Sequence, residues 1–273
     1  MAIEYKTDEQ ILAMREAGLV VARIHAALRQ AARPGITTAD MDDVALAVLR
    51  EAGAESNFYG YYDYPSQICT SVNEVIVHGI PGERILQPGD LVSFDCGAVV
   101  GGWHADAAFS MVLDGGDGQV RADRARLSEV TEQAMWRGIA ALATGKRIGD
   151  VGRAIDDYVS GLPEEPGIVE AYVGHGIGSA MHQEPDVPNF RTRSRGERLR
   201  PGMVLCIEPM LTAGDQANEV LEDEWTVVTT DGSDACHWEH EVAIHEGGIW
   251  VLTAFDGGAA GLAPFGVTPV PLG

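Results

Sequence analysis

The stretch "GDLVSFDCGAVVGGWHADAAFSMVL", residues 89–113, decides the fold. Apolar and polar residues alternate on both sides of the glycine-rich segment "GAVVGG", which predicts a β-hairpin. Asp95 and Asp106 stand on opposite arms of this hairpin, inside apolar runs. Carboxylates are seldom buried unless they are paired or bind a metal, because an isolated buried charge is costly. Cross-strand neighbours on one face lie about 5 Å apart, so we expect both aspartates to reach one ion.

Helical patterns flank the hairpin on both sides. Residues 7–35 and 37–53 each begin with a capping-type threonine, have apolar residues spaced by three and four, and end at glycine. After the hairpin, residues 121–145 and 147–161 show similar patterns. Strand-like stretches follow the helices in each set, at 67–82 in the first and at 167–178, 202–211, 224–232 and 236–246 in the second.

This repeated order indicates two pseudo-equivalent halves, near residues 7–113 and 121–255, that close on a shared sheet. We expect them to form a single domain over residues 1–255. Residues 256–273 are rich in Gly and Pro and are predicted to form an irregular tail.

Composition excludes some classes of partner. The 273 residues include 19 basic and 41 acidic side chains, a net charge of −22. This charge repels phosphate backbones and anionic lipid, so neither nucleic acid nor a membrane is expected as a partner. No apolar run reaches the roughly 20 residues that span a bilayer, and no signal-like segment opens the chain. Four scattered cysteines, without a Cys-x-x-Cys pair, favour reduced thiols and a cytoplasmic location.

Two glutamates occur in apolar surroundings like those of the two aspartates, and a histidine occurs in a glycine-rich segment. Glu208 in "LCIEPM" and Glu239 in "CHWEHEV" also lie in apolar, strand-like surroundings, and His175 in "GHGIG" adds an imidazole. Singly, each has an ordinary explanation as a turn or hydrogen-bonding residue, and "GHGIG" does not fit the dinucleotide-binding glycine pattern. Together the five suit two divalent ions such as Mn, Fe, Co or Zn better than one structural zinc. Paired ions are a recurring hydrolytic device.

The ordered motifs "HGIPG", "DCGAVVGGWHAD", "GHGIG" with "MHQEP", "IEPM", "EWTVVTTDG" and "WEHE" resemble those of the type I methionine aminopeptidases, over roughly residues 8–247. The resemblance implies the pita-bread fold, an α/β (α+β) arrangement of two pseudo-symmetric halves. Their helices pack around a mainly antiparallel curved sheet with a central dinuclear metal site. It also implies a cytoplasmic monomer that removes the N-terminal methionine of nascent polypeptides, at the ribosome or away from it, when the second residue is small.

The resemblance also implies roles for individual residues. Asp95 would chelate one ion, Asp106 and Glu239 would bridge both, and His175 and Glu208 would complete the second. Glu208 would in addition carry a proton from the attacking water to the leaving amine.

Substrate contacts follow from the same resemblance. His182 would hydrogen-bond the scissile carbonyl, and His78 would contact the substrate near the departing amine. The methionine pocket would be lined by Tyr61, Tyr64, Cys69, Met181 and Trp225, although the alternative is that these are ordinary core residues.

Several positions depart from the family pattern. Tyr62, Asp63, Ala105 and Met181 put the shape of the pocket in question more than the chemistry. Glu241 shares a strand face with Glu239 two residues before it, so we hypothesise that it faces the metal site and alters metal loading. A solvated or salt-bridged Glu241 is the alternative.

Two other functions stay open. One is a proline-type (Xaa-Pro) aminopeptidase of the same fold, although such enzymes usually carry a substantial extra N-terminal domain. The other is a non-catalytic peptide- or ribosome-binding protein, although relatives of that kind lose metal ligands and this chain keeps all five.

Overall fold

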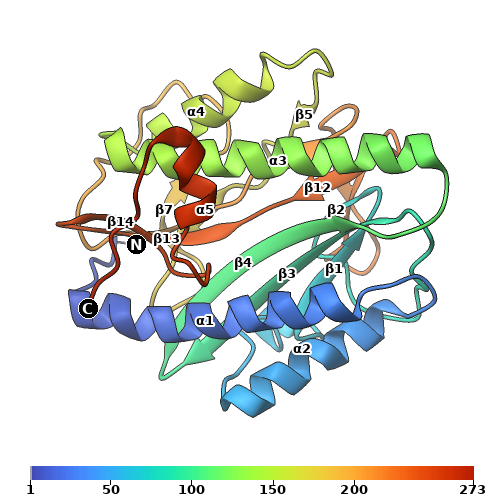
Figure 1. Cartoon of the computed structure of the whole chain (residues 1–273), viewed down its shortest axis with the longest axis horizontal. Coiled ribbons are helices and arrows are strands. Elements are labelled where there is room, and N and C mark those ends of the chain that lie inside the picture. The colour runs from blue at the N-terminus through green and yellow to red at the C-terminus, as the bar shows by residue number, and fades with distance from the viewer. Residues whose placement is uncertain (1) are drawn as a thin grey trace.

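The computed structural model describes residues 2–273. Two long helices, α1 (Asp8–Ala31) and α3 (Gly118–Thr144), run along the two sides of a set of curved strands (Figure 1). Helix α1 contacts the hairpin strands and α2 (Thr38–Ala52), while α3 contacts α4 (Gly149–Val159) and strands of both halves. All four helices were predicted from the sequence, and the α/β (α+β) class is confirmed.

The first two helices begin where their capping residues predict. Thr7 accepts a hydrogen bond from the Gln10 N–H at 3.3 Å, and the Gln10 side chain accepts one from the Thr7 N–H at 2.9 Å. Thr37 and Asp40 form the same capping box at the start of α2. Gly53 then ends α2 in the left-handed conformation with φ 63°, which glycine adopts without steric cost.

The predicted hairpin is present, but its aspartates are not directly opposite. Strands β1 (Ile68–Val72), β3 (Leu91–Val100) and β4 (Trp103–Val112) form an antiparallel sheet in the order β1-β3-β4. Asp95 pairs with Ala108, and Asp106 pairs with Gly97. The two aspartates are therefore diagonal neighbours on one face, about 7–8 Å apart at the backbone, still within reach of side chains.

The remaining strands form three further antiparallel sheets. One of them pairs β2 of the first half with β11 of the second, which joins the halves. The five-stranded sheet has the order β14 (Gly248–Val251), β13 (His240–His245), β8 (Val204–Ile207), β6 (Gly174–Gly176), β7 (Gln183–Val187). The three-stranded sheets are β12 (Ala235–His237), β9 (Met210–Thr212), β5 (Gly167–Ile168), and β10 (Asn218–Val220), β11 (Val227–Thr229), β2 (Val75–Val77).

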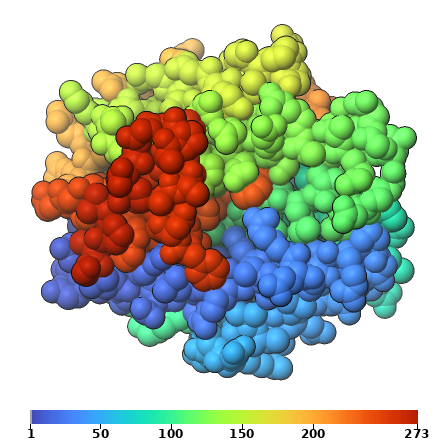
Figure 2. Space-filling model, in the orientation of Figure 1, coloured from blue at the N-terminus to red at the C-terminus, as the bar shows by residue number. Residues whose placement is uncertain are grey.

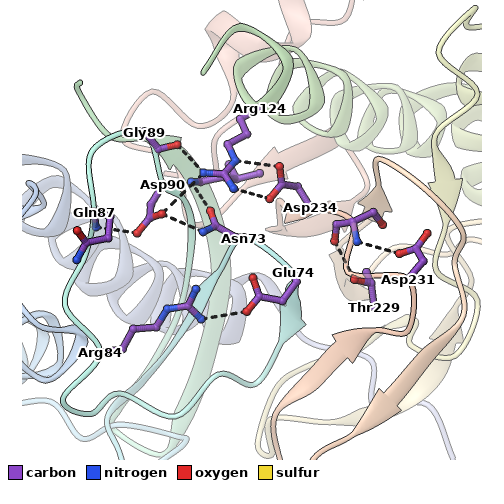
Figure 3. Close-up of polar contacts among 12 residues, drawn as sticks. Asn73, Glu74, Arg84, Gln87, Gly89, Asp90, Arg124, Thr229, Asp231 and Asp234 are labelled. Atoms are coloured by element: carbon purple, nitrogen blue, oxygen red, sulfur yellow. Dashed lines mark hydrogen bonds and ion pairs between the residues drawn. The ribbon is translucent and has the colours of Figure 1, made fainter. Parts of the chain in front are cut away.

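An arginine on α3 links the halves at one end of the sheets (Figure 3). Arg124 makes a bidentate pair with Asp234, with N···O distances of 2.9 and 2.8 Å, and donates to the Gly89 carbonyl at 2.8 Å. Its guanidinium also lies 3.8 Å from Asp90, which accepts from the Asn73 amide. Bidentate pairs of this kind fix geometry as well as charge. The loops that lead into β3 and β12 are therefore held by one side chain.

Residues 256–273 differ from the irregular tail that the sequence predicts. They contain α5 (Ala259–Leu262) and a 3-10 turn, η2 (Ala263–Phe265), and Leu262 is fully buried. The Val270 main chain donates to Ile249 at 2.8 Å and accepts from the His245 ring at 2.7 Å. Figure 2 shows this segment, in red, packed on the surface beside the N-terminal helix. Among residues 2–273, no helix is long and apolar enough to cross a membrane.

Candidate active site

A cavity of about 400 Å³ is lined by residues from both halves. All the residues singled out from the sequence as ligands, catalytic groups or pocket residues line it. Its lining includes carboxylates and imidazoles together with aromatic and sulfur-containing side chains. The structure thus brings together residues as distant in sequence as Tyr61 and Glu239.

The three predicted ligands Asp95, Asp106 and Glu239 converge because of the hairpin register. Ala108, the partner of Asp95, exchanges main-chain hydrogen bonds with Glu239 at 2.9 and 3.3 Å. Glu239 therefore lies beside the hairpin face that carries both aspartates. Carboxylate oxygens of the three residues lie within 4.8 Å of one another.

The other two predicted ligands complete the cluster. The His175 Nε2 atom lies 3.4 Å from Glu208 Oε1. His175 also has a ligand atom within 4.8 Å of Asp106, and likewise of Glu239. Asp106 and Glu239 are thus close both to Asp95 and to His175, a position that suits bridging ligands.

The carboxylates fit divalent cations. Burial and neighbouring carboxylates raise the pKa of Asp106, Glu208 and Glu239 well above the usual range, and burial raises the pKa of Asp95 to about 7. Each has a buried oxygen without a hydrogen-bond donor among residues 2–273, and Asp106 can donate to Asp95 only when it is protonated. Buried, unpaired carboxylates are costly, so divalent cations shared among the four would remove this cost.

The ring of His175 presents its Nε2 atom to this cluster. Its Nδ1 lies 3.0 Å from the Gly176 carbonyl, so Nδ1–H is the donor and Nε2 is left with a lone pair. Burial lowers the pKa of His175 to about 3, which keeps the ring neutral and able to bind a metal. A Cβ atom at Gly176 would lie 2.3 Å from the Glu184 carbonyl oxygen, which explains the glycine beside this histidine.

His182 is held by groups on both sides of the cavity. Its Nδ1 lies 2.8 Å from the Tyr61 hydroxyl, and its ring is edge-on to His175 with centroids 4.4 Å apart. Residues on either side of it are bound to the N-terminal residues, because Glu4 accepts hydrogen bonds from the Ser179 N–H at 3.1 Å and the Gln183 amide at 2.7 Å. These contacts help to fix the position of His182, and they were not predicted from the sequence.

His78 directly follows β2 and has a positive φ of 59°, uncommon for a residue other than glycine. Its ring is edge-on to Tyr172 and Trp225, with centroid distances of 5.5 and 6.0 Å. Burial lowers the pKa of His78 to about 4. A neutral imidazole is therefore fixed in the cavity wall.

The predicted pocket residues form one apolar cluster. Tyr64, Cys69 and Met181 are buried, and Tyr61 and Trp225 pack against them. Phe58 belongs to the same cluster and lines the cavity, although it was not predicted from the sequence.

Three departures from the family pattern, Tyr62, Asp63 and Met181, lie at or near this pocket. Tyr62 is 80% exposed and packs edge-on against Tyr61 with centroids 4.7 Å apart. Asp63 next to it is also exposed, whereas Ala105 is buried in β4.

Glu241 lies behind the metal-ligand cluster rather than in the cavity. Its side chain is fully buried, and Oε2 accepts a hydrogen bond from the Asp106 N–H at 3.4 Å. Within residues 2–273 it forms no ion pair shorter than 4 Å and belongs to no group that could hold a metal. A solvated Glu241 is thereby excluded, and its contact is with the backbone of a predicted bridging ligand.

Comparison with known proteins places the chain in a family. Residues 12–246 match Metallopeptidase family M24. The chain is 47% identical over 256 residues to methionine aminopeptidase 1 of Mycobacterium tuberculosis, covering 92% of this chain and 95% of that protein. It is 42% identical over 248 residues to the Bacillus subtilis protein of the same name, covering 91% and 98%.

Solved structures agree with this placement. A methionine aminopeptidase from Thermotoga maritima has a TM-score of 0.87 at 37% identity and covers 93% of this chain and 100% of its own. A prolidase from Pyrococcus furiosus, with a TM-score of 0.69 at 19% identity, covers 91% of this chain and 65% of its own and shares the fold. The predicted pita-bread fold is confirmed. This chain belongs to the metallopeptidase family M24.

Proposed function

We propose that this protein is a methionine aminopeptidase, a hydrolase that removes the N-terminal methionine of nascent polypeptides when the second residue is small. One observation carries the proposal: a buried cluster of four carboxylates and an imidazole opens into the same cavity as a sulfur-tolerant aromatic pocket. The names of the relatives from Mycobacterium tuberculosis and Bacillus subtilis agree with it.

The proposed cofactor is a pair of divalent ions, Co, Mn, Fe or Zn. Asp95 would hold the first ion, His175 and Glu208 the second, and Asp106 and Glu239 both, in keeping with the overlapping ligand groups. When bound, the ions supply Lewis acidity to the scissile carbonyl and to the attacking water.

The side chains of the protein carry out the remaining steps. Glu208 accepts a proton from the attacking water and delivers it to the leaving amine. His182 donates a hydrogen bond to the scissile carbonyl oxygen as charge develops there, while Tyr61 orients its ring from Nδ1. His78 contacts the substrate near the departing amine.

Specificity for methionine would come from the apolar cluster. Tyr64, Cys69 and Met181 offer a buried, polarisable surface, and Trp225 closes one wall. Each methylene gained or lost in such a pocket is worth about 1–3 kcal/mol, so norleucine is the substitute that we expect to be accepted best.

The proposed setting is the cytoplasm, with the protein as a monomer acting at the ribosome or on released chains. Four buried, unpaired cysteines fit a reducing compartment. The charge of −22 disfavours ribosomal RNA as the point of contact.

Release of methionine from Met-Ala-Ser tests the function. We expect chelator to abolish release and Mn, Fe, Co or Zn to restore it, with Met-Ala-Ser preferred over a peptide with a bulky second residue. Asp106→Asn should lose activity, whereas the exposed-site control Glu9→Gln should keep it. Preference for an Xaa-Pro peptide would identify the proline-type alternative, and no release with any metal would reject a peptidase.

A further inference from the structure

The cavity wall contains an imidazole that has no role in the proposed mechanism. His237 ends β12, is 2% exposed and lines the cavity. Its Nε2 atom is buried without a hydrogen-bond partner among residues 2–273, and it lies 3.8 Å from Glu208 Oε2. Buried polar atoms are rarely left unpaired unless they have a function.

The backbone holds this ring in place. The His237 N–H donates to the Ser93 hydroxyl at 3.3 Å, and its carbonyl accepts from the Ser110 hydroxyl at 2.7 Å. Ser93 and Ser110 are opposite each other in the hairpin and lie 2.7 Å apart. Both main-chain groups of His237 are therefore bonded to the strands that carry the two aspartates, which leaves the ring little freedom except rotation about its own bonds.

Glu208 lies between two imidazoles, one for each carboxylate oxygen. His175 Nε2 is 3.4 Å from Oε1, and His237 Nε2 is 3.8 Å from Oε2. Because His175 donates through Nδ1 to Gly176, its Nε2 carries a lone pair and could bind a metal. The side of Glu208 that faces His175 is therefore the side on which the proposed ion would lie. An ionised carboxylate only accepts hydrogen bonds. The His237 ring is therefore expected in the tautomer opposite to that of His175, with the proton on the Nε2 atom that faces Oε2.

The geometry favours a donor over an additional metal ligand. None of the groups able to hold an ion within residues 2–273 includes His237. Closing the 3.8 Å distance to a normal hydrogen bond of about 2.9 Å needs a movement of roughly 0.9 Å. Catalytic hydrogen bonds are often long in ligand-free proteins and shorten in the working complex.

We propose that His237 is a positioning residue that donates an Nε2–H hydrogen bond to Glu208 Oε2. This contact, which rests on the proposed function of Glu208, keeps Oε1 turned toward His175, where the two residues together would hold an ion. The second lone pair of Oε2 stays available for the proton taken from water. The orientation of the carboxylate is thereby fixed from both sides.

Three substitutions of His237 test the contact. His237→Gln keeps an amide donor at similar reach, whereas His237→Leu removes it; His237→Asn keeps the amide but is one methylene too short to reach Glu208. Loss of an outer contact of this kind costs 10–100-fold in activity or metal affinity. We expect Leu and Asn to lower kcat on Met-Ala-Ser by 10–100-fold with KM changed less than threefold, and Gln to stay within about threefold of the parent.

A second readout does not depend on turnover. Absorption spectra of the Co²⁺-loaded protein report coordination, and calorimetric titration gives the number and affinity of bound ions. We expect Leu and Asn to bind two ions, to perturb the spectrum and to weaken one ion, while Gln and the remote control His245→Gln match the parent. Equal kcat and affinity for Asn and Gln would overturn the proposal, as would loss of one ion in the Leu variant, because that would make His237 a ligand.

Failure of the His237 proposal can be distinguished from failure of the proposed peptidase function. An inactive parent would reject the peptidase function, yet the spectra and titrations would still decide the His237 contact. If the Leu variant does not fold, as judged by thermal unfolding, the Gln and Asn pair decides it alone.

Discussion

Stripping the bound ions from this protein and then raising the pH is expected to destabilise it. Without ions, the carboxyl groups of Asp95, Asp106, Glu208 and Glu239 keep protons that the unfolded chain would lose, because burial raises their pKa. These four groups then bind more protons in the folded state than in the unfolded state. Their contribution to the free energy of unfolding therefore falls with rising pH over that range, while buried histidines with lowered pKa values, such as His175 and His237, act in the opposite direction below pH 6.5.

The pKa of Asp95 gives the size of this loss of unfolding free energy. Its pKa rises from 3.8 to about 7, which corresponds to at most about 4 kcal/mol at roughly 1.4 kcal/mol per pKa unit. This stability is fully present below pH 4 and is lost as the pH rises through 7. Between pH 5 and pH 8 the loss from Asp95 alone is therefore about 3 kcal/mol, and the other three carboxyl groups act in the same direction.

Urea unfolding of chelator-treated protein, followed by tryptophan fluorescence at pH 5, 6.5 and 8, measures this slope. The variant Asp95→Asn should change the stability difference between pH 5 and pH 8 by about 3 kcal/mol, whereas Glu9→Gln, at an exposed carboxylate, should leave it unchanged. Addition of Mn²⁺ at pH 8 should restore stability, and calorimetry at pH 6 should detect protons released on binding. A pH dependence of stability that is the same in Asp95→Asn and in the parent, or ion binding without proton release, would refute the reasoning.

Three other perturbations have defined outcomes. His182→Ala should lower kcat by about 10²–10³-fold, the usual cost of a lost donor to a developing oxyanion, while calorimetry still finds the parental number of ions; parental kcat would contradict its role. Glu4→Ala removes the acceptor of the Ser179 N–H, so amide exchange at Ser179 should accelerate and kcat should fall about tenfold, and unchanged exchange would show that the contact is unimportant. Glu241→Thr should weaken metal binding by about 10–100-fold, because Glu241 orients Asp106 through its N–H; equal affinity would reject the hypothesis.

Local chemistry made the first half of the fold predictable. Thr7 and Gly53 mark helix ends by side-chain capping and by left-handed backbone, which are properties of single residues. The offset of the aspartates was also available from the sequence. A two-residue Gly101–Gly102 turn, with φ of 58° and 81°, pairs Val100 with Trp103 and so fixes the register of the whole hairpin.

Short elements were not predictable in the same way. Strands β7, β10 and β14 have three to five residues, too few for a period of two to stand out. They exist because neighbouring strands offer them main-chain partners. The same holds for α5, which packs on α3 through a buried Leu262 in a Gly-rich segment.

The residues of the candidate site were easier to predict than the residues that hold them in position. The ordered motifs pointed to all five residues that now form the buried cluster, yet nothing in them pointed to the bonds of Glu4 or to the side of Glu208 that His237 faces. His237 lies two residues before Glu239, so alternation along a strand was the one available signal. Hydrogen-bond partners that are far apart in the sequence produce no periodic pattern from which the contact could be predicted.

The ligand cluster has a consequence for the fold as a whole. Asp95 and Asp106 come from the hairpin of the first half, while His175, Glu208 and Glu239 come from the second. Without cations, each of the four carboxyl groups keeps a buried oxygen without a hydrogen-bond partner among residues 2–273, at the junction where β2 pairs with β11 and Arg124 joins two loops. Ions bound there would pair with carboxylates of both halves, so we expect metal affinity and the free energy of unfolding to be linked. Any substitution that loosens this junction, even far from the cavity, should therefore weaken metal binding and stability together.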